Sequence, residues 1–202
     1  DSLVSILEKY PNVNILSDEI YSRILYDNEK FISLIEYPQL RDRIIILDGW
    51  SKTYAMTGWR LGYGIFPNKL YEIAEKLAVN IHSCVNSSAQ YAALEALNGP
   101  QNCVSEMNNH FKKRAHLMFS KLNEINGFSC QKPNGAFYCF PNITGTGKNS
   151  TEIQNILLDN LGVATVAGTS FGKYGEGYIR LSCANSDSAI EEAVSRIKEF
   201  FN

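Results

Sequence analysis

The run Arg43-Ile-Ile-Ile-Leu47, apolar in its last four residues, is the feature that most restricts how this chain can fold. A run so rich in β-branched residues is typical of a strand covered on both faces of a sheet. Hydrophobic periodicity and Pro/Gly/Asn breaks predict further strands at 13–16 and 61–66, and helices at 1–10, 70–79 and 87–97. Short strands that alternate with helices predict an α/β layer architecture with a mostly parallel sheet.

The second half of the chain has a different character. Asn98-Gly99-Pro100 interrupts the pattern, and a long polar helix is expected at about 101–123, with apolar residues along one face. Beyond it the pattern predicts strands at 136–140, 163–166 and 178–182, and helices at 150–160 and 186–201. This is the pattern of a small α+β unit, so we place a domain boundary within the long helix, giving domains of 1–110 and 111–202.

Composition excludes several classes of function. The net charge of -2 carries no electrostatic signature of nucleic-acid binding, and no apolar run approaches the roughly 20 residues that a membrane-spanning helix needs. Five widely spaced cysteines without a C-x-x-C pair suggest neither a disulfide framework nor a metal site, and favour a reducing cytoplasmic location. The first residue is Asp1 rather than Met, so we expect a processed chain or a piece of a longer one.

The turn after the apolar run carries a lysine of special interest. Lys52 follows this strand directly and has Trp50, Tyr54 and Trp59 nearby. Desolvation there would favour a partly neutral, nucleophilic amine. The alternative is an ordinary lysine in a surface loop.

Two further charges can join this lysine. Asp18 follows the strand at 13–16, and Arg60 comes eight residues after Lys52. Open α/β sheets place ligands at the carboxyl ends of their strands, so the three side chains can share one crevice. A carboxylate, an amine and a guanidinium are the charges that a pyridoxal phosphate site requires, for the ring nitrogen, the Schiff base and the phosphate. A surface cluster of salt bridges is the alternative.

Four motifs, spread over nearly the whole chain, resemble the class I aminotransferases of the fold type I pyridoxal phosphate enzymes. They are Ser17-Asp-Glu-Ile-Tyr21, Ser51-Lys-Thr-Tyr-Ala-Met-Thr-Gly-Trp-Arg-Leu-Gly-Tyr63, Pro133-Asn-Gly-Ala-Phe-Tyr138 and Tyr178-Ile-Arg-Leu-Ser182. The resemblance implies that 1–110 is the C-terminal part of the large cofactor-binding domain and that 111–202 is the small C-terminal domain.

The resemblance also implies a role for each matching residue. Lys52 would form the Schiff base with pyridoxal 5'-phosphate and move the proton at the substrate α-carbon. Asp18 would pair with the ring nitrogen, and Tyr21 would donate to the phenolic oxygen of the cofactor. Ser51 and Arg60 would belong to the cofactor-binding set, with Arg60 on the phosphate. Arg180 would hold the substrate α-carboxylate in a bidentate pair.

Two of the departures from the family pattern bear on cofactor binding. Gly49 stands where many relatives carry a serine that contacts the phosphate. Family members also carry about as much sequence again before this point, with the phosphate loop and the aromatic that stacks on the ring. The resemblance therefore implies the C-terminal half of an aminotransferase, and we expect the chain alone to bind the cofactor weakly or not at all.

Several functions remain open on these grounds. The first is a transaminase of the aspartate aminotransferase type, which moves an amino group between an amino acid and a 2-oxo acid as a homodimer. Alternatives are an aromatic or broad-range aminotransferase, another fold type I enzyme such as a lyase or decarboxylase, and an inactive fragment. The residues that fix the substrate side chain would lie largely in the other half or on a partner subunit.

Overall fold

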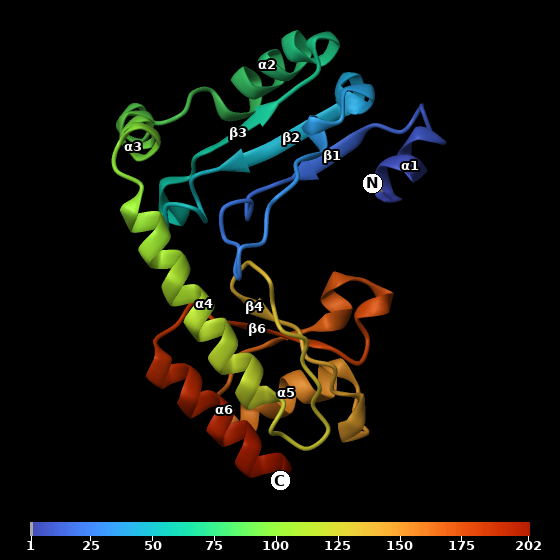
Figure 1. Cartoon of the computed structure of the whole chain (residues 1–202), viewed down its shortest axis with the longest axis vertical. Helices are drawn as coiled ribbons and strands as arrows, with labels where there is room; N and C mark the ends of the chain where they lie inside the picture. Colours follow the sequence, from blue (N-terminus) through green and yellow to red (C-terminus); the bar gives the residue numbers. More distant parts are fainter. Residues whose placement is uncertain (1) are drawn as a thin grey trace. The chain divides into compact units, whose positions relative to one another are not determined.

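The computed structural model describes residues 2–202, which form two compact units (Figure 1). The first unit comprises the chain up to residue 24 together with 30–105, and the second comprises 25–29 together with 106–202. The division in the long helix therefore falls at Ser105–Glu106, whereas the sequence suggested residues 110 and 111. Residues 25–29 group with the second unit although the chain on both sides of them belongs to the first.

The first unit is built on a three-stranded sheet in the order β1-β2-β3. The strands are β1 (Ile15–Asp18), β2 (Ile44–Gly49) and β3 (Gly62–Ile65). β1 and β2 are parallel, with Ile15 opposite Ile44, whereas β3 is antiparallel to β2, with Gly62 opposite Gly49. The carboxyl ends of β1 and β2 therefore meet the amino end of β3 at one edge of the sheet.

Only one face of the central strand is buried, which corrects the prediction that both faces of 43–47 are covered. Ile44 and Ile46 are 3% and 4% exposed, and helix α1 (Ser2–Glu8) and the 3-10 turns at 34–43 supply the residues that pack there. Ile45 and Leu47 point to the other face and are only half-buried. Leu16, the β1 neighbour of Ile45, is 61% exposed. This continuous apolar run therefore forms a strand whose second face is only partly covered by the residues that the structure describes.

Helices α2 (Asn68–His82) and α3 (Ser87–Asn98) complete the first unit (Figure 1). α3 begins at the N-cap Asn86, whose side chain accepts from Ala89 N. Its small residues Ala89 and Ala93 are buried with Met56 and Leu61.

α2 has apolar residues at helical spacing but no buried residue. Ile73, Leu77 and Ile81 recur every four residues on one side and are 57%, 55% and 68% exposed. An amphipathic helix normally buries such a stripe, so α2 presents an uncovered apolar surface.

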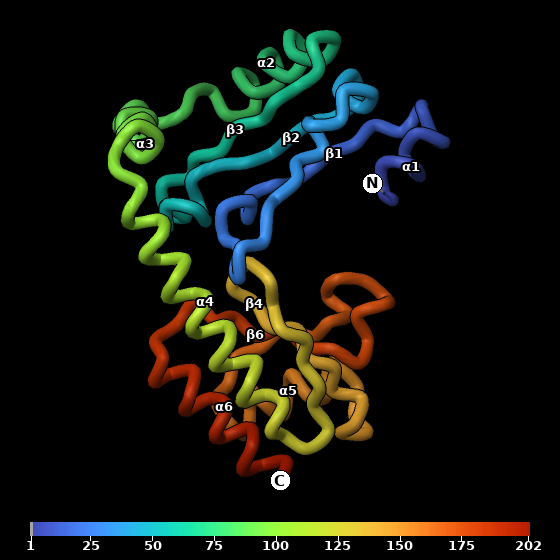
Figure 2. Tube along the Cα trace, in the orientation of Figure 1, coloured from blue at the N-terminus to red at the C-terminus, as the bar shows by residue number. Residues whose placement is uncertain are grey.

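The second unit contains helices α4, α5 and α6 (Figure 2) and a small antiparallel sheet. Its elements are α4 (Asn102–Leu122, which begins in the first unit), β4 (Tyr138–Cys139), α5 (Ser150–Leu161), β5 (Val166–Ala167), β6 (Ile179–Ser182) and α6 (Asp187–Phe201), and the sheet order is β4-β6-β5. α6 lies along α4, where Asp187 accepts from Lys113 and Arg114 and Lys198 donates to Glu124.

Residues 25–29 are fixed within the second unit by one buried ring and one carboxylate. The Tyr26 side chain is 1% exposed, and its hydroxyl donates to Ala136 O. Asp27 forms ion pairs with Lys112 and Lys132 at 2.7 and 2.5 Å, and these hydrogen bonds lower the pKa of Asp27 to about 2. Among residues 2–202, no helix has the length and apolar character needed to cross a membrane.

Candidate functional site

Lys52 lies in a tight turn directly after β2. Tyr54 N donates to Trp50 O at 3.2 Å and Ala55 N donates to Lys52 O at 3.3 Å, and the neighbouring Thr53 is 3% exposed. The Lys52 side chain is half-buried, and its Nζ lies 5.9 Å from the centroid of the Tyr21 ring. An ammonium at this distance interacts favourably with an aromatic face. The turn therefore holds the amine beside a ring from the segment that follows β1.

A cavity of about 440 Å³ at this edge of the sheet brings the predicted charges together. Asp18, Ser51, Lys52 and Arg60 all line it. Asp18 and Ser51 arrive there because β1 and β2 are parallel and end side by side. Arg60 arrives because β3 is antiparallel and begins where β2 ends. The expectation of a shared crevice is thus met, but for Arg60 the reason is the reversed direction of β3.

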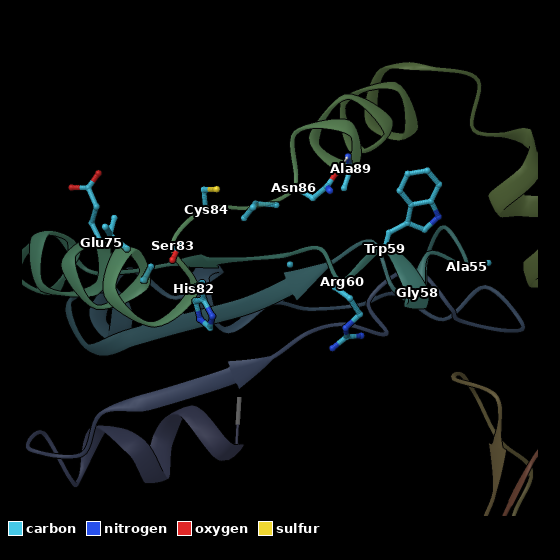
Figure 3. A pocket seen from close by; sticks show the side chains of 14 residues that line it. Ala55, Gly58, Trp59, Arg60, Glu75, His82, Ser83, Cys84, Asn86 and Ala89 are labelled. Atoms are coloured by element: carbon cyan, nitrogen blue, oxygen red, sulfur yellow. Dashed lines mark hydrogen bonds between the residues drawn. The ribbon is translucent and has the colours of Figure 1, made fainter.

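Arg60 itself adopts a left-handed backbone conformation, with φ of 57° and ψ of 46°. Its Nη1 donates to Thr57 O at 2.9 Å, and the side chain is exposed. Arg60 also borders a second cavity of about 930 Å³, which reaches His82 at the end of α2 and Asn86 at the start of α3. Figure 3 shows the Arg60 side chain pointing to the opposite side of the backbone from that of Trp59. Left-handed geometry at a non-glycine residue costs free energy, and here it turns the guanidinium away from the neighbouring indole.

Sequence reasoning missed two carboxylates near the cavity. Glu19 is 7% exposed, and its Oε1 accepts from Ser17 Oγ at 3.0 Å and Ser33 Oγ at 2.9 Å. Asp48 lines the cavity and accepts from the Tyr63 hydroxyl at 3.1 Å across the β2–β3 pair. Burial of Tyr63, followed by the charge of Asp48, raises the pKa of the Tyr63 hydroxyl. An acidic residue at a strand end was the only signal for either carboxylate, and it does not identify the hydroxyl partners.

The structure explains why position 49 is a glycine. A Cβ there would lie 2.7 Å from Leu61 O and 2.9 Å from Gly62 Cα. Both obstacles are backbone atoms of the segment that pairs with β2. A serine at this position therefore requires β2 and β3 to move apart.

Arg180, the predicted carboxylate ligand, belongs to the second unit. Its guanidinium carbon lies 4.5 Å from the centroid of the Tyr138 ring and 4.7 Å from that of Phe171. Tyr138 on β4 is paired in register with Ser182 of β6, the strand that carries Arg180. Within residues 2–202 the guanidinium has no ion pair and no hydrogen bond to another residue. In contact with both rings, it keeps its planar set of donors available for an acid.

Comparisons with known proteins identify the family. The family model "Aminotransferase class I and II" matches residues 1–197. The chain belongs to the class I and II aminotransferases. Among curated proteins, it is 36% identical to an aspartate aminotransferase of Pyrococcus horikoshii, over 98% of this chain and 50% of that one. An aspartate aminotransferase of Geobacillus stearothermophilus is 40% identical over 93% of this chain and 49% of its own length.

Solved aminotransferase structures match the fold as well. An aromatic aminotransferase from Pyrococcus horikoshii superposes with a TM-score of 0.94 at 35% identity, covering 98% of this chain and 53% of that one. The aspartate aminotransferase from Rhizobium meliloti gives 0.91 at 36% identity, covering 98% and 52%. The α/β fold is therefore that of an aminotransferase portion, as the sequence predicted. The chain spans about half the length of the relatives it matches.

Proposed function

We propose that the parent protein is a transaminase that moves an amino group between an amino acid and a 2-oxo acid, with pyridoxal 5'-phosphate held at Lys52. The observation that carries this proposal is the single cavity lined by Asp18, Ser51, Lys52 and Arg60. An amine, a carboxylate, a hydroxyl and a guanidinium are the donor set that fits an aromatic aldehyde with a ring nitrogen and a phosphate. When bound, the cofactor supplies the aldehyde that condenses with amines and the ring that withdraws electrons from the substrate α-carbon.

Each residue of the chain then has a task of its own. Lys52 Nζ would hold the cofactor through its aldehyde carbon, with the aldehyde oxygen leaving as water, and the free amine would accept and return the proton at the substrate α-carbon. The Asp18 carboxylate would keep a proton on the ring nitrogen, and the Tyr21 hydroxyl would donate to the phenolic oxygen. Arg60 and Ser51 would hold the phosphate.

Arg180 would bind the α-carboxylate of the substrate. The two flanking rings support this role because they restrict the guanidinium before any ligand arrives, which lowers the entropic cost of a bidentate pair. The side-chain preference that we propose first is the aspartate and glutamate type, because two relatives are named aspartate aminotransferases. The second is the aromatic type, which the likeness to an aromatic aminotransferase favours. A lyase or decarboxylase, or an inactive fragment, are the remaining alternatives.

Reductive trapping with pyridoxal phosphate tests the site directly. After incubation and borohydride reduction, peptide mass spectrometry should find the added pyridoxyl group on Lys52 in preference to Lys69, a control lysine on the exposed helix α2. Lys52→Arg should abolish the preferred modification. Modification spread evenly over the lysines would refute a cofactor site at this turn.

How tightly the chain alone binds pyridoxal phosphate is a separate question. Because the chain spans about half of its relatives, we expect the visible absorbance of the lysine-bound cofactor to be weak and lost on dialysis. A tight, Lys52-dependent band would contradict that expectation. Half-reaction rates of the full-length parent with aspartate and with phenylalanine would separate the two substrate classes. We also propose that this parent is a cytoplasmic homodimer, as expected from the sequence.

A further inference from the structure

The Lys52 turn is anchored on both sides by aromatic side chains that lie two residues from the lysine. Trp50 Nε1 donates to Ala93 O of α3 at 3.1 Å. The Tyr54 hydroxyl donates to Gln101 Oε1 at 3.1 Å. The two anchors reach backbone and side-chain groups at the C-terminal half of α3 and just beyond it, so the position of the turn depends on that helix.

Gln101 is the centre of this arrangement. Its Oε1 accepts from the Tyr54 hydroxyl and from Arg23 Nη1, the latter at 2.9 Å. Its Nε2 donates to Ala96 O at 2.9 Å and to Gly99 O at 2.8 Å. An amide side chain has two donor hydrogens and two acceptor lone pairs, so Gln101 uses its full capacity. Two of these bonds also satisfy carbonyls at the end of α3, where a helix leaves acceptors without intrahelical partners.

Arg23 connects the same network to the segment that follows β1. Its Nη1 donates to the Tyr54 hydroxyl at 2.8 Å as well as to Gln101. Arg23 lies two residues after Tyr21, the ring that Lys52 approaches. Arg23, Tyr54 and Gln101 therefore form a closed triangle of hydrogen bonds, which joins the Tyr21 segment to the Lys52 turn.

We propose that Arg23, Tyr54 and Gln101 are positioning residues that set the approach of Lys52 to Tyr21 and to the cavity. None of the three lines that cavity, so each acts through the backbone of a neighbour. The assignment of a catalytic role to Lys52 rests on the proposed function, whereas the positioning itself does not. The competing explanation is a set of surface hydrogen bonds of little consequence, since Arg23 is exposed.

Lysine methylation with a carbon-13 label reports the position of Lys52 without any cofactor. Reductive methylation of the full chain gives one methyl resonance per lysine, and Lys52→Arg identifies the signal of Lys52. In the chain without substitutions, ring current from Tyr21 should displace the Lys52 signal from that of the exposed Lys69. Cross-relaxation should connect the Lys52 signal to the Tyr21 ring protons. Gln101→Met, which keeps the length of the side chain but none of its hydrogen bonds, should abolish both features.

Two matched variants separate positioning from general damage. Gln101→Glu keeps the oxygen acceptors for Arg23 and Tyr54, so it should retain the displaced Lys52 signal. Gln90→Met makes the same substitution on α3 at an exposed residue whose side chain, within residues 2–202, bonds only to Val85 O, and it should leave the signal unchanged.

Tyr54→Phe keeps the ring and removes both bonds of its hydroxyl, and it decides the matter if Gln101→Met does not fold. An unchanged Lys52 signal in folded Gln101→Met, or in Tyr54→Phe, would overturn the proposal. Failure of the proposed function can be distinguished from failure of this proposal. It would appear as unselective trapping of pyridoxal phosphate in the chain without substitutions, while the Lys52 methyl signal stays displaced.

Discussion

Gly49→Ala tests how closely β2 and β3 approach at the edge that carries the candidate site. The added Cβ would lie 2.7 Å from Leu61 O and 2.9 Å from Gly62 Cα. Overpacking of this kind typically costs ~1–3 kcal/mol, and rigid backbone obstacles place the cost in the upper part of that range. Alanine also restricts the unfolded chain, which returns about 0.4–1 kcal/mol. We therefore expect a net destabilisation of about 2 kcal/mol.

Tryptophan fluorescence is the appropriate assay for this effect. The two tryptophans of the chain, Trp50 and Trp59, both lie in the first unit, so their emission follows the unfolding of that unit. For a unit of roughly 100 residues, 2 kcal/mol corresponds to a fall in Tm of about 8–16 °C. With an m-value of about 2 kcal/mol/M in urea, the midpoint should fall by about 1 M.

Gly58→Ala is the matched control, because a Cβ at Gly58 has no heavy atom within 4 Å among the described residues. It should therefore show only the effect on the unfolded chain, a stabilisation of about 0.4–1 kcal/mol. Equal destabilisation by the two alanines would refute the argument from the spacing of β2 and β3. Gly49→Ser should be at least as destabilising as Gly49→Ala, since it adds an oxygen to the same clash.

Three further outcomes follow from the charges and the exposed surfaces. The pKa of Asp27 is lowered to about 2 by its two lysines, so this pairing stabilises the fold above the unfolded pKa of about 4 and loses its effect as the pH falls toward 2. Asp27→Asn should therefore reduce the loss of stability between about pH 4 and pH 2, measured by unfolding followed by circular dichroism, and an unchanged pH dependence would contradict the assignment. Leu77→Lys should reduce concentration-dependent self-association in sedimentation velocity, because it interrupts the apolar stripe of α2; equal association would exclude that stripe. Phe171→Leu should lower the affinity for 2-oxoglutarate about 2–5-fold, as followed by the NMR signal of the Arg180 Nε–H, which is the equivalent of about 0.5–1 kcal/mol of cation–π stacking. An unchanged affinity would show that this ring does not position the guanidinium.

Local sequence patterns predicted the bounds of the helices well but those of the short strands less well. The predicted helix at 150–160 is α5, Ser150–Leu161, which begins at an Asn149 capping box. The predicted strand at 163–166 shrinks to Val166–Ala167. Gly162, in a left-handed conformation, and Val163 both donate to carbonyls of α5. The apolar Val163 therefore belongs to the end of a helix, which alternation along a strand does not reveal.

Some features of the candidate site could likewise be predicted from the sequence, and others could not. Asp18 and Lys52 could be predicted because each follows a recognisable strand, and strand ends converge. The orientation of β3, the burial of Glu19 and the bonds of Gln101 could not, since each depends on partners far away in the sequence. Gln101 joins residues that are 78 and 47 positions apart from it. No local pattern records such a contact, because a glutamine after a helix is compatible with many surroundings.

The open face of the sheet explains why we expect the chain alone to bind cofactor weakly. Asp18 lies on the same face as Leu47, its β2 neighbour, and that face also carries Ile45 and the exposed Leu16. Hydrogen bonds within the first unit fix the Lys52 turn, so the charges keep their arrangement even where this face meets water. Water screens each charge and lowers the value of every ion pair with a phosphate. Weak binding would therefore reflect the missing cover of the sheet, and adding that cover should raise the affinity without moving Lys52 relative to Tyr21.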